Sequence, residues 1–72
     1  MSTKEQIEVT ANGQIRAIPT GQTIRQLLEA LLLDPARVAV ELDRRIVKPH
    51  NWDTTPIPDG AHLEIVQFVG GG

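Results

Sequence analysis

Apolar and polar residues alternate along the first part of the chain. From Gln6 to Ala11 every second residue is apolar, which is the period of a strand with one buried face. Asn12-Gly13 follows directly, and these two residues tolerate the positive φ angles of a two-residue hairpin turn. We therefore expect residues 14–18 to return as an antiparallel strand. Because Ile15 and Ile18 cannot both face one side of a regular strand, we assign Ile18 to the core.

The apolar period changes to that of a helix after Pro19-Thr20-Gly21. Thr23, with Gln26 three residues later, has the pattern of a capping box and predicts a helix start. Four apolar residues then follow at intervals of three and four and form one stripe: Ile24, Leu27, Leu28 and Leu31. We expect the helix to run to about Leu33 and to end at Asp34-Pro35, because the residue before a proline is disfavoured in the α region.

Beyond the helix the chain returns to short extended segments. Val38–Leu42 alternates again and predicts a third strand, after which residues 43–45 turn the chain into a short apolar pair, Ile46-Val47. Residues 48–60 contain three prolines and predict an irregular arm with one helical turn. Within this arm we expect Trp52 to cover an edge of the core rather than to bind a ligand.

The last predicted strand, His62–Phe68, is where the pattern first points to a contact surface. If Leu63 and Ile65 face the core, the even-numbered residues face outward: Glu64, Val66 and Phe68. Clustered apolar side chains on an exposed face usually mark a contact surface, so we expect these residues to meet a partner. The alternative is that the strand ends before Phe68 and that its ring folds back onto the core.

Composition limits the function classes. Seventy-two residues form one small domain, and the absence of cysteine excludes disulfides, thiolate metal sites and cysteine nucleophiles. A net charge of −2 with one Trp and one Phe argues against nucleic-acid and membrane partners. The spacing of His50 and His62 matches no usual metal-ligand pattern, so we predict no metal site. The polar residues 1–6 lack the apolar segment of a secretory signal, and we expect a cytoplasmic protein.

The predicted order of elements is that of the β-grasp, or ubiquitin-like, fold. A hairpin, one helix and shorter strands follow one another, and the last strand returns to the centre of a mixed sheet. We therefore predict an α+β domain over residues 1–68, with four to five strands and one main helix packed on one sheet face. Residues 69–72 are predicted to form a flexible glycine tail, since successive glycines lose the most backbone freedom on ordering.

The tail, Val69-Gly70-Gly71-Gly72, suggests a chemistry of its own. Fully extended it spans roughly 13 Å, and a backbone without side chains enters a slot that an ordinary peptide cannot. Its α-carboxylate is an anion at neutral pH and can attack the α-phosphate of ATP once another protein positions both groups. A frayed end without function is the alternative interpretation of the same residues.

Several short segments follow one another in a recognisable order: Asn12-Gly13, residues 21–24 with Leu27-Leu28, Val38–Leu42, Pro49 with Trp52, Asp59-Gly60, residues 63–66 and residues 68–72. Taken together they resemble the ThiS family, the sulfur carrier proteins of thiamine biosynthesis. None of them is specific alone, because a terminal Gly-Gly also occurs in ubiquitin and in the small subunit of molybdopterin synthase. Their order, the chain length and an end flush with the glycines carry the resemblance over nearly the whole chain.

The resemblance implies a role as a protein substrate rather than as an enzyme. In the family, an E1-like adenylyltransferase joins the terminal carboxylate to AMP, with ATP and Mg²⁺ that belong to that enzyme, and the carrier binds no cofactor. A persulfide from a cysteine desulfurase-type donor then displaces AMP, which leaves a thiocarboxylate on Gly72 for a thiazole synthase. Val69, Gly70 and Gly71 are then the arm that threads into the partner. The family commonly ends in two glycines, so the third one lengthens this arm.

Two other classes of function remain open on the sequence. One keeps the sulfur chemistry but changes the acceptor to molybdopterin, another thiolated metabolite or RNA. The other is a β-grasp interaction module with an inert glycine end, or a modifier joined to lysines through an isopeptide bond. Resemblance over residues 38–52 favours thiamine over molybdopterin.

Overall fold

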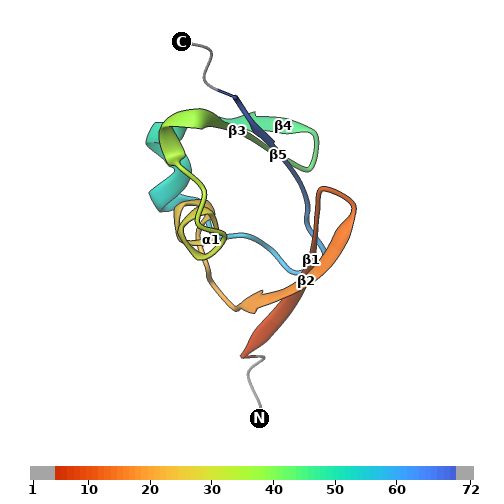
Figure 1. Ribbon diagram of the computed structural model, residues 1–72. Helices are drawn as coiled ribbons and strands as arrows, with labels where there is room; N and C mark the ends of the chain where they lie inside the picture. The colour runs from red at the N-terminus through yellow and green to blue at the C-terminus, as the bar shows by residue number, and fades with distance from the viewer. Residues whose placement is uncertain (1–4, 70–72) are drawn as a thin grey trace.

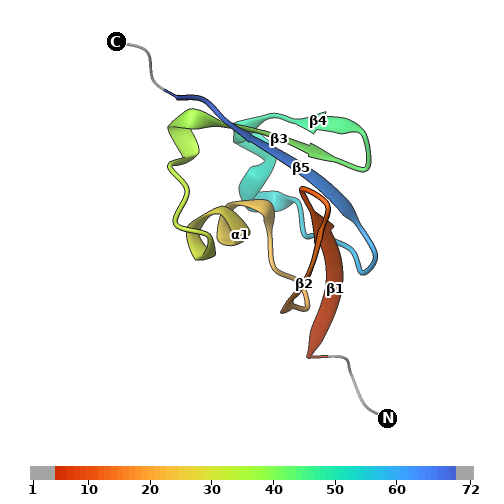
Figure 2. The ribbon, with the colours of Figure 1, turned by 45° about the vertical axis from the view of Figure 1, so that its right-hand side comes forward.

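A computed structural model describes residues 5–69 of the chain and shows a mixed five-stranded sheet that curves around one helix (Figures 1 and 2). The elements are β1 (Gln6–Ala11), β2 (Gln14–Pro19), α1 (Ile24–Ala30), the 3₁₀ turn η1 (Pro35–Arg37), β3 (Val38–Leu42), β4 (Arg45–Val47), the 3₁₀ segment η2 (Pro49–Thr54) and β5 (His62–Gln67). The strand order is β2-β1-β5-β3-β4, with β1 and β5 parallel and the other neighbours antiparallel. This is the predicted β-grasp fold. In the described part of the chain no helix is both long and apolar enough to cross a membrane.

The β1–β2 hairpin forms as its sequence predicts. Asn12 and Gly13 have φ angles of 51° and 80°, the left-handed values of a two-residue type I′ turn. Ile18 pairs with Ile7 and is 4% exposed, whereas Ile15 points to the opposite face and is 72% exposed. The assignment of Ile18 to the core is therefore confirmed.

The Asn12 side chain also fixes β5 against the hairpin. The strand pairing between β1 and β5 covers only two residues on each strand. Beyond it, Asn12 Nδ2 donates to the Ile65 carbonyl oxygen at 3.0 Å, and Asn12 Oδ1 accepts from the Ile65 amide at 2.7 Å. The Asn12 side chain thus makes the hydrogen bonds that a longer β1 would make, at the point where the hairpin turns away from β5. It fixes the C-terminal half of β5 to the hairpin.

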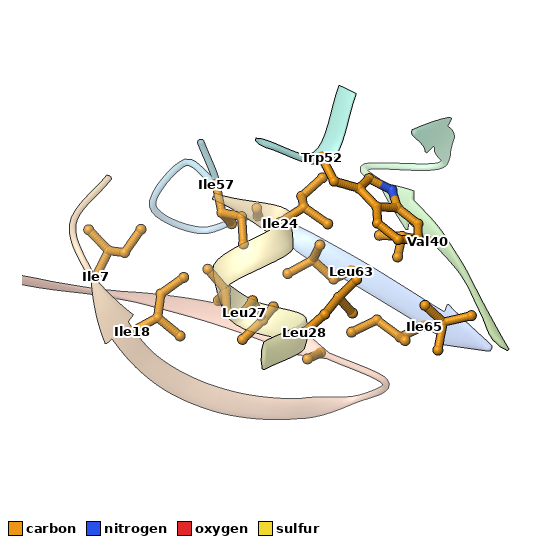
Figure 3. Close-up of a cluster of buried hydrophobic side chains, with 14 residues drawn as sticks. Ile7, Ile18, Ile24, Leu27, Leu28, Val40, Trp52, Ile57, Leu63 and Ile65 are labelled. Carbon is orange, nitrogen blue, oxygen red and sulfur yellow. The ribbon is translucent and has the colours of Figure 1, made fainter. Parts of the chain in front are cut away.

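The core lies between α1 and the inner sheet face (Figure 3). The helix contributes Ile24, Leu27 and Leu28 from the predicted stripe, and all are at most 2% exposed. Trp52 is only 1% exposed, and its indole Nε1 donates to the Val47 carbonyl oxygen at 2.8 Å. The predicted packing role of Trp52 is therefore confirmed: it is fully buried beside β4, the edge strand of the sheet.

The helix ends earlier than its apolar pattern predicts, so the prediction of an end near Leu33 is wrong. The last helical residue is Ala30, and two backbone hydrogen bonds close the helix: the Leu32 amide donates to the Glu29 oxygen and the Leu33 amide to the Leu28 oxygen, both at 3.0 Å. These are the bonds of a Schellman motif. Asp34 then caps η1, which begins at Pro35: the Asp34 carboxylate accepts from the Ala36 amide at 3.0 Å.

Leu32 occupies the position of the Schellman motif that glycine usually takes, with a φ of 60°. Its side chain is 92% exposed, so it gains little from packing while its Cβ is strained. We expect Leu32→Gly to raise the free energy of unfolding by about 1 kcal/mol, measured by urea denaturation. Leu32→Ala is the matched control and should change little, because alanine keeps the Cβ. A less stable glycine variant would contradict this interpretation of the turn.

Candidate functional site

The candidate site is built on β5, the strand that carries the chain toward its C-terminal end. β5 lies at the centre of the sheet between β1 and β3, and after Gln67 the Phe68 amide donates to the Arg37 carbonyl oxygen at 2.6 Å. Val69 follows with 94% of its surface exposed. The end of β5 and the start of β1 lie at opposite ends of the molecule (Figures 1 and 2). The predicted tail residues Gly70, Gly71 and Gly72 lie outside the described residues.

The three residues predicted as partner surface lie on the outer face of the sheet or next to it. Leu63 and Ile65 are buried, which turns Glu64 and Val66 outward on β5. Phe68 follows directly after the end of this strand. Val66 and Phe68 are each 55% exposed. One part of the alternative is confirmed, because β5 ends at Gln67, one residue before the predicted end. Its other part is wrong, since Phe68 does not fold back onto the core. An apolar surface therefore stands directly beside Val69.

The sheet register adds two residues to this surface that sequence reasoning did not assign. Glu41 on β3 lies directly opposite Glu64, and Ile46 on β4 lies directly opposite Glu41. The three side chains therefore stand in one row across β5, β3 and β4 on the outer face. Ile46 is 72% exposed. The alternation of residues 38–42 already turns Glu41 outward, but only the pairing of β3 with β5 places it beside Glu64.

The remaining polar groups do not gather into a reactive arrangement. Among residues 5–69 no group of three or more His, Asp or Glu side chains lies close enough to hold a metal ion. His50 belongs to η2 and His62 to β5, and both are exposed. What this arrangement presents is Val69, the last described residue, beside an apolar and acidic surface.

A search of protein families matches residues 4–72 to the ThiS family. The chain belongs to this family. The match covers nearly the whole length, including the glycine tail and the β5 surface. The family resemblance of the sequence segments is thereby confirmed.

Individual relatives of the ThiS family agree with this assignment. The sulfur carrier protein ThiS of Escherichia coli K12 is 29% identical over 66 residues, which cover 92% of this chain and 100% of that protein. A thiazole synthase of Paramagnetospirillum magneticum is 36% identical over 66 residues, but the chain spans only 20% of its length. The crystal structure of the thiamine biosynthesis protein ThiS from Geobacter metallireducens superposes with a TM-score of 0.76 at 29% identity, covering 92% of this chain and 100% of that one.

Proposed function

We propose that the protein is a sulfur carrier of thiamine biosynthesis and that the α-carboxylate of Gly72 is its reactive group. In this proposal the protein is a substrate and supplies no catalytic residue. The observation that carries the proposal is the family match over residues 4–72, which includes the glycines that follow the exposed Val69.

The proposed chemistry has three steps. A Gly72 carboxylate oxygen attacks the α-phosphate of ATP in an E1-like adenylyltransferase, which forms an acyl-adenylate and releases pyrophosphate. A persulfide sulfur from a desulfurase-type donor then attacks the acyl carbon and expels AMP, because the adenylate is a better leaving group than a carboxylate oxygen. A thiol finally cleaves the S–S bond of the acyl disulfide, which leaves the thiocarboxylate and oxidises that thiol. The chain has no cysteine, so partner proteins supply every sulfur.

The proposed acceptor is the thiazole precursor held by a thiazole synthase. The Paramagnetospirillum thiazole synthase contains a segment similar to this chain within a much longer protein, and a similar protein of known three-dimensional structure is a thiamine biosynthesis protein. Both observations support thiazole formation over transfer to molybdopterin. Neither points to attachment to lysines.

Exchange of pyrophosphate into ATP tests the first step. The full chain is mixed with the adenylyltransferase of its native host, ATP, Mg²⁺ and labelled pyrophosphate, and label in ATP is counted. We expect exchange that depends on this protein and that saturates with its concentration. The enzyme preparation is first shown to be active with another carrier protein. Absence of exchange with this chain under the same conditions would overturn the proposal.

Phe68 provides a test of the docking surface. We expect Phe68→Ala to weaken binding to the adenylyltransferase by about tenfold or more, because exposed aromatic residues at interfaces often dominate the binding energy. Its effect on thermal stability should be small, since the ring is 55% exposed. Isothermal titration calorimetry measures the first quantity and circular dichroism the second.

Ile15→Ala is the matched control for Phe68→Ala. Ile15 is 72% exposed and lies on β2, separated from β5 by β1. Its truncation should leave binding unchanged within about twofold. Equal losses for both variants, or a large loss of stability in Phe68→Ala, would contradict the assignment of Phe68 to the docking surface.

A further inference from the structure

Two glutamates face each other at the centre of the outer sheet face. Glu41 and Glu64 are directly opposite in the antiparallel pairing of β3 with β5, so their Cβ atoms lie roughly 5 Å apart on one face. Like charges in this position destabilise a sheet. No lysine, arginine or histidine among residues 5–69 forms an ion pair with either carboxylate. The isolated domain therefore carries a like-charge pair that no ion pair within residues 5–69 neutralises.

Exposed apolar side chains surround the two carboxylates. Ile46 lies beside Glu41, and Val66 follows Glu64 on the same face. These side chains are 72% and 55% exposed. A protein that covers them removes the carboxylates from water as well, and two adjacent anions without water or a cation are very costly to bury.

Cations among residues 5–69 form no ion pair with these two carboxylates. Glu41 and Glu64 line one shallow hollow of about 380 Å³ with Asp43, Arg44 and His62. Arg44 belongs to the β3–β4 turn and pairs with none of these carboxylates. Asp43 is already occupied, since its Oδ1 accepts from the His62 amide at 2.9 Å. The face is thus apolar with an acidic centre, and its complement is apolar with a cationic centre.

We propose that the β5-β3-β4 part of the outer sheet face docks on the adenylyltransferase through an arginine of that enzyme, held between Glu41 and Glu64. A guanidinium is planar and has five donors, so one group can satisfy two neighbouring carboxylates. Contacts with Ile46 and Val66 would exclude water around it. The inference rests on the proposed function and adds to it the chemistry by which the partner recognises the carrier: the charge repulsion in the free protein becomes an attraction in the complex.

Charge-removing variants of the full chain test this inference. Glu41→Gln, Glu64→Gln and the double variant keep side-chain shape. The control Glu5→Gln/Glu29→Gln removes two charges from exposed positions, one just before β1 and one on α1. Affinity for the adenylyltransferase is measured by calorimetry at about 50 and 300 mM salt, which brackets a strong change in screening. We expect each single variant to bind about tenfold more weakly and the double variant at least thirtyfold more weakly. The control should bind within twofold of the wild type.

Stability and salt dependence separate docking from a structural role. The double variant should melt at the same temperature as the wild type or about 1–5 °C higher, because a repulsion has been removed. Its affinity should also depend less on salt than that of the wild type. Wild-type affinity in the double variant, or a lower melting temperature, would overturn the inference.

Pyrophosphate exchange, measured in the same samples, distinguishes failure of the proposed arginine contact from failure of the proposed carrier function. If the wild type supports exchange while the double variant binds as tightly as the wild type, only the arginine contact is wrong. If the wild type supports no exchange, the carrier function itself is wrong.

Discussion

Deletion of Gly72 is expected to abolish adenylation and to leave the free energy of unfolding unchanged. The deletion moves the α-carboxylate back by one residue, about 3.3–3.6 Å along an extended chain. Reacting atoms must approach to roughly 3–3.5 Å in the correct orientation, and a displacement of 1 Å already costs about 100-fold in rate. Pyrophosphate exchange should therefore fall by more than about 100-fold. Stability should not change, because the last described residue, Val69, is 94% exposed.

Gly72→Ala is the matched control for this deletion. It keeps the position of the carboxylate and adds only a Cβ. A lower exchange rate in this variant would therefore show that the partner's slot is too narrow for a side chain, not that the carboxylate fails to reach the ATP. Its exchange rate should lie between those of the wild type and the deletion. Exchange at the wild-type rate by the deletion variant would contradict the assignment of Gly72 as the reactive residue. A lower melting temperature would show that the end of the chain contributes to the fold.

Trp52→Ala is expected to lower the free energy of unfolding by about 3–5 kcal/mol, as large-to-small substitutions of buried aromatic residues do. The indole is 1% exposed within the core, and its Nε1–H donates to the Val47 carbonyl oxygen. Small domains are stable by only about 5–15 kcal/mol, so this variant should be close to unfolding at ambient temperature. Urea denaturation followed by circular dichroism measures the change, since removing the single tryptophan also removes the fluorescent probe.

Trp52→Phe separates the two contributions of the indole. Phenylalanine keeps much of the apolar volume but leaves the Val47 carbonyl without its donor, which costs about 1–3 kcal/mol for a buried group. The Arg25 guanidinium lies 5.6 Å from the Trp52 ring centroid and pairs with Asp53 at 3.3 Å. These contacts are partly exposed and should add little. A loss below about 1 kcal/mol in Trp52→Ala would contradict the assignment of this residue to the core.

Local chemistry explains why much of the fold follows from the sequence. Asn12-Gly13 and the Thr23–Gln26 capping box act within a few residues, and both form as predicted. The end of α1 could not be predicted from the sequence, because apolar residues continue to Leu33 although the backbone has already turned at Leu32. Ile57 and Ala61 are buried but were not assigned to the core. Ile57 stands between two prolines, so no period marks it, and the Ile57 amide bonds to the distant Gln22 oxygen.

The candidate site shows the same division between local and distant information. The alternation of residues 62–68 turns Glu64, Val66 and Phe68 outward without knowledge of any neighbour. The row formed by Glu64, Glu41 and Ile46 depends on which strands pair and in what register. Ile46 follows Glu41 within one hairpin, but Glu64 lies more than twenty residues farther along the chain than Glu41, so no short pattern encodes their pairing.

The intact mass of the protein after complete sulfur transfer tests the account most directly. The full chain is incubated with the adenylyltransferase, ATP, Mg²⁺, the persulfide donor and a thiol, and fragmentation then locates any mass change. The account predicts a species heavier by the difference between one sulfur and one oxygen atom, with the change confined to Gly72. An unchanged mass with all components active, or a change on any other residue, would contradict it.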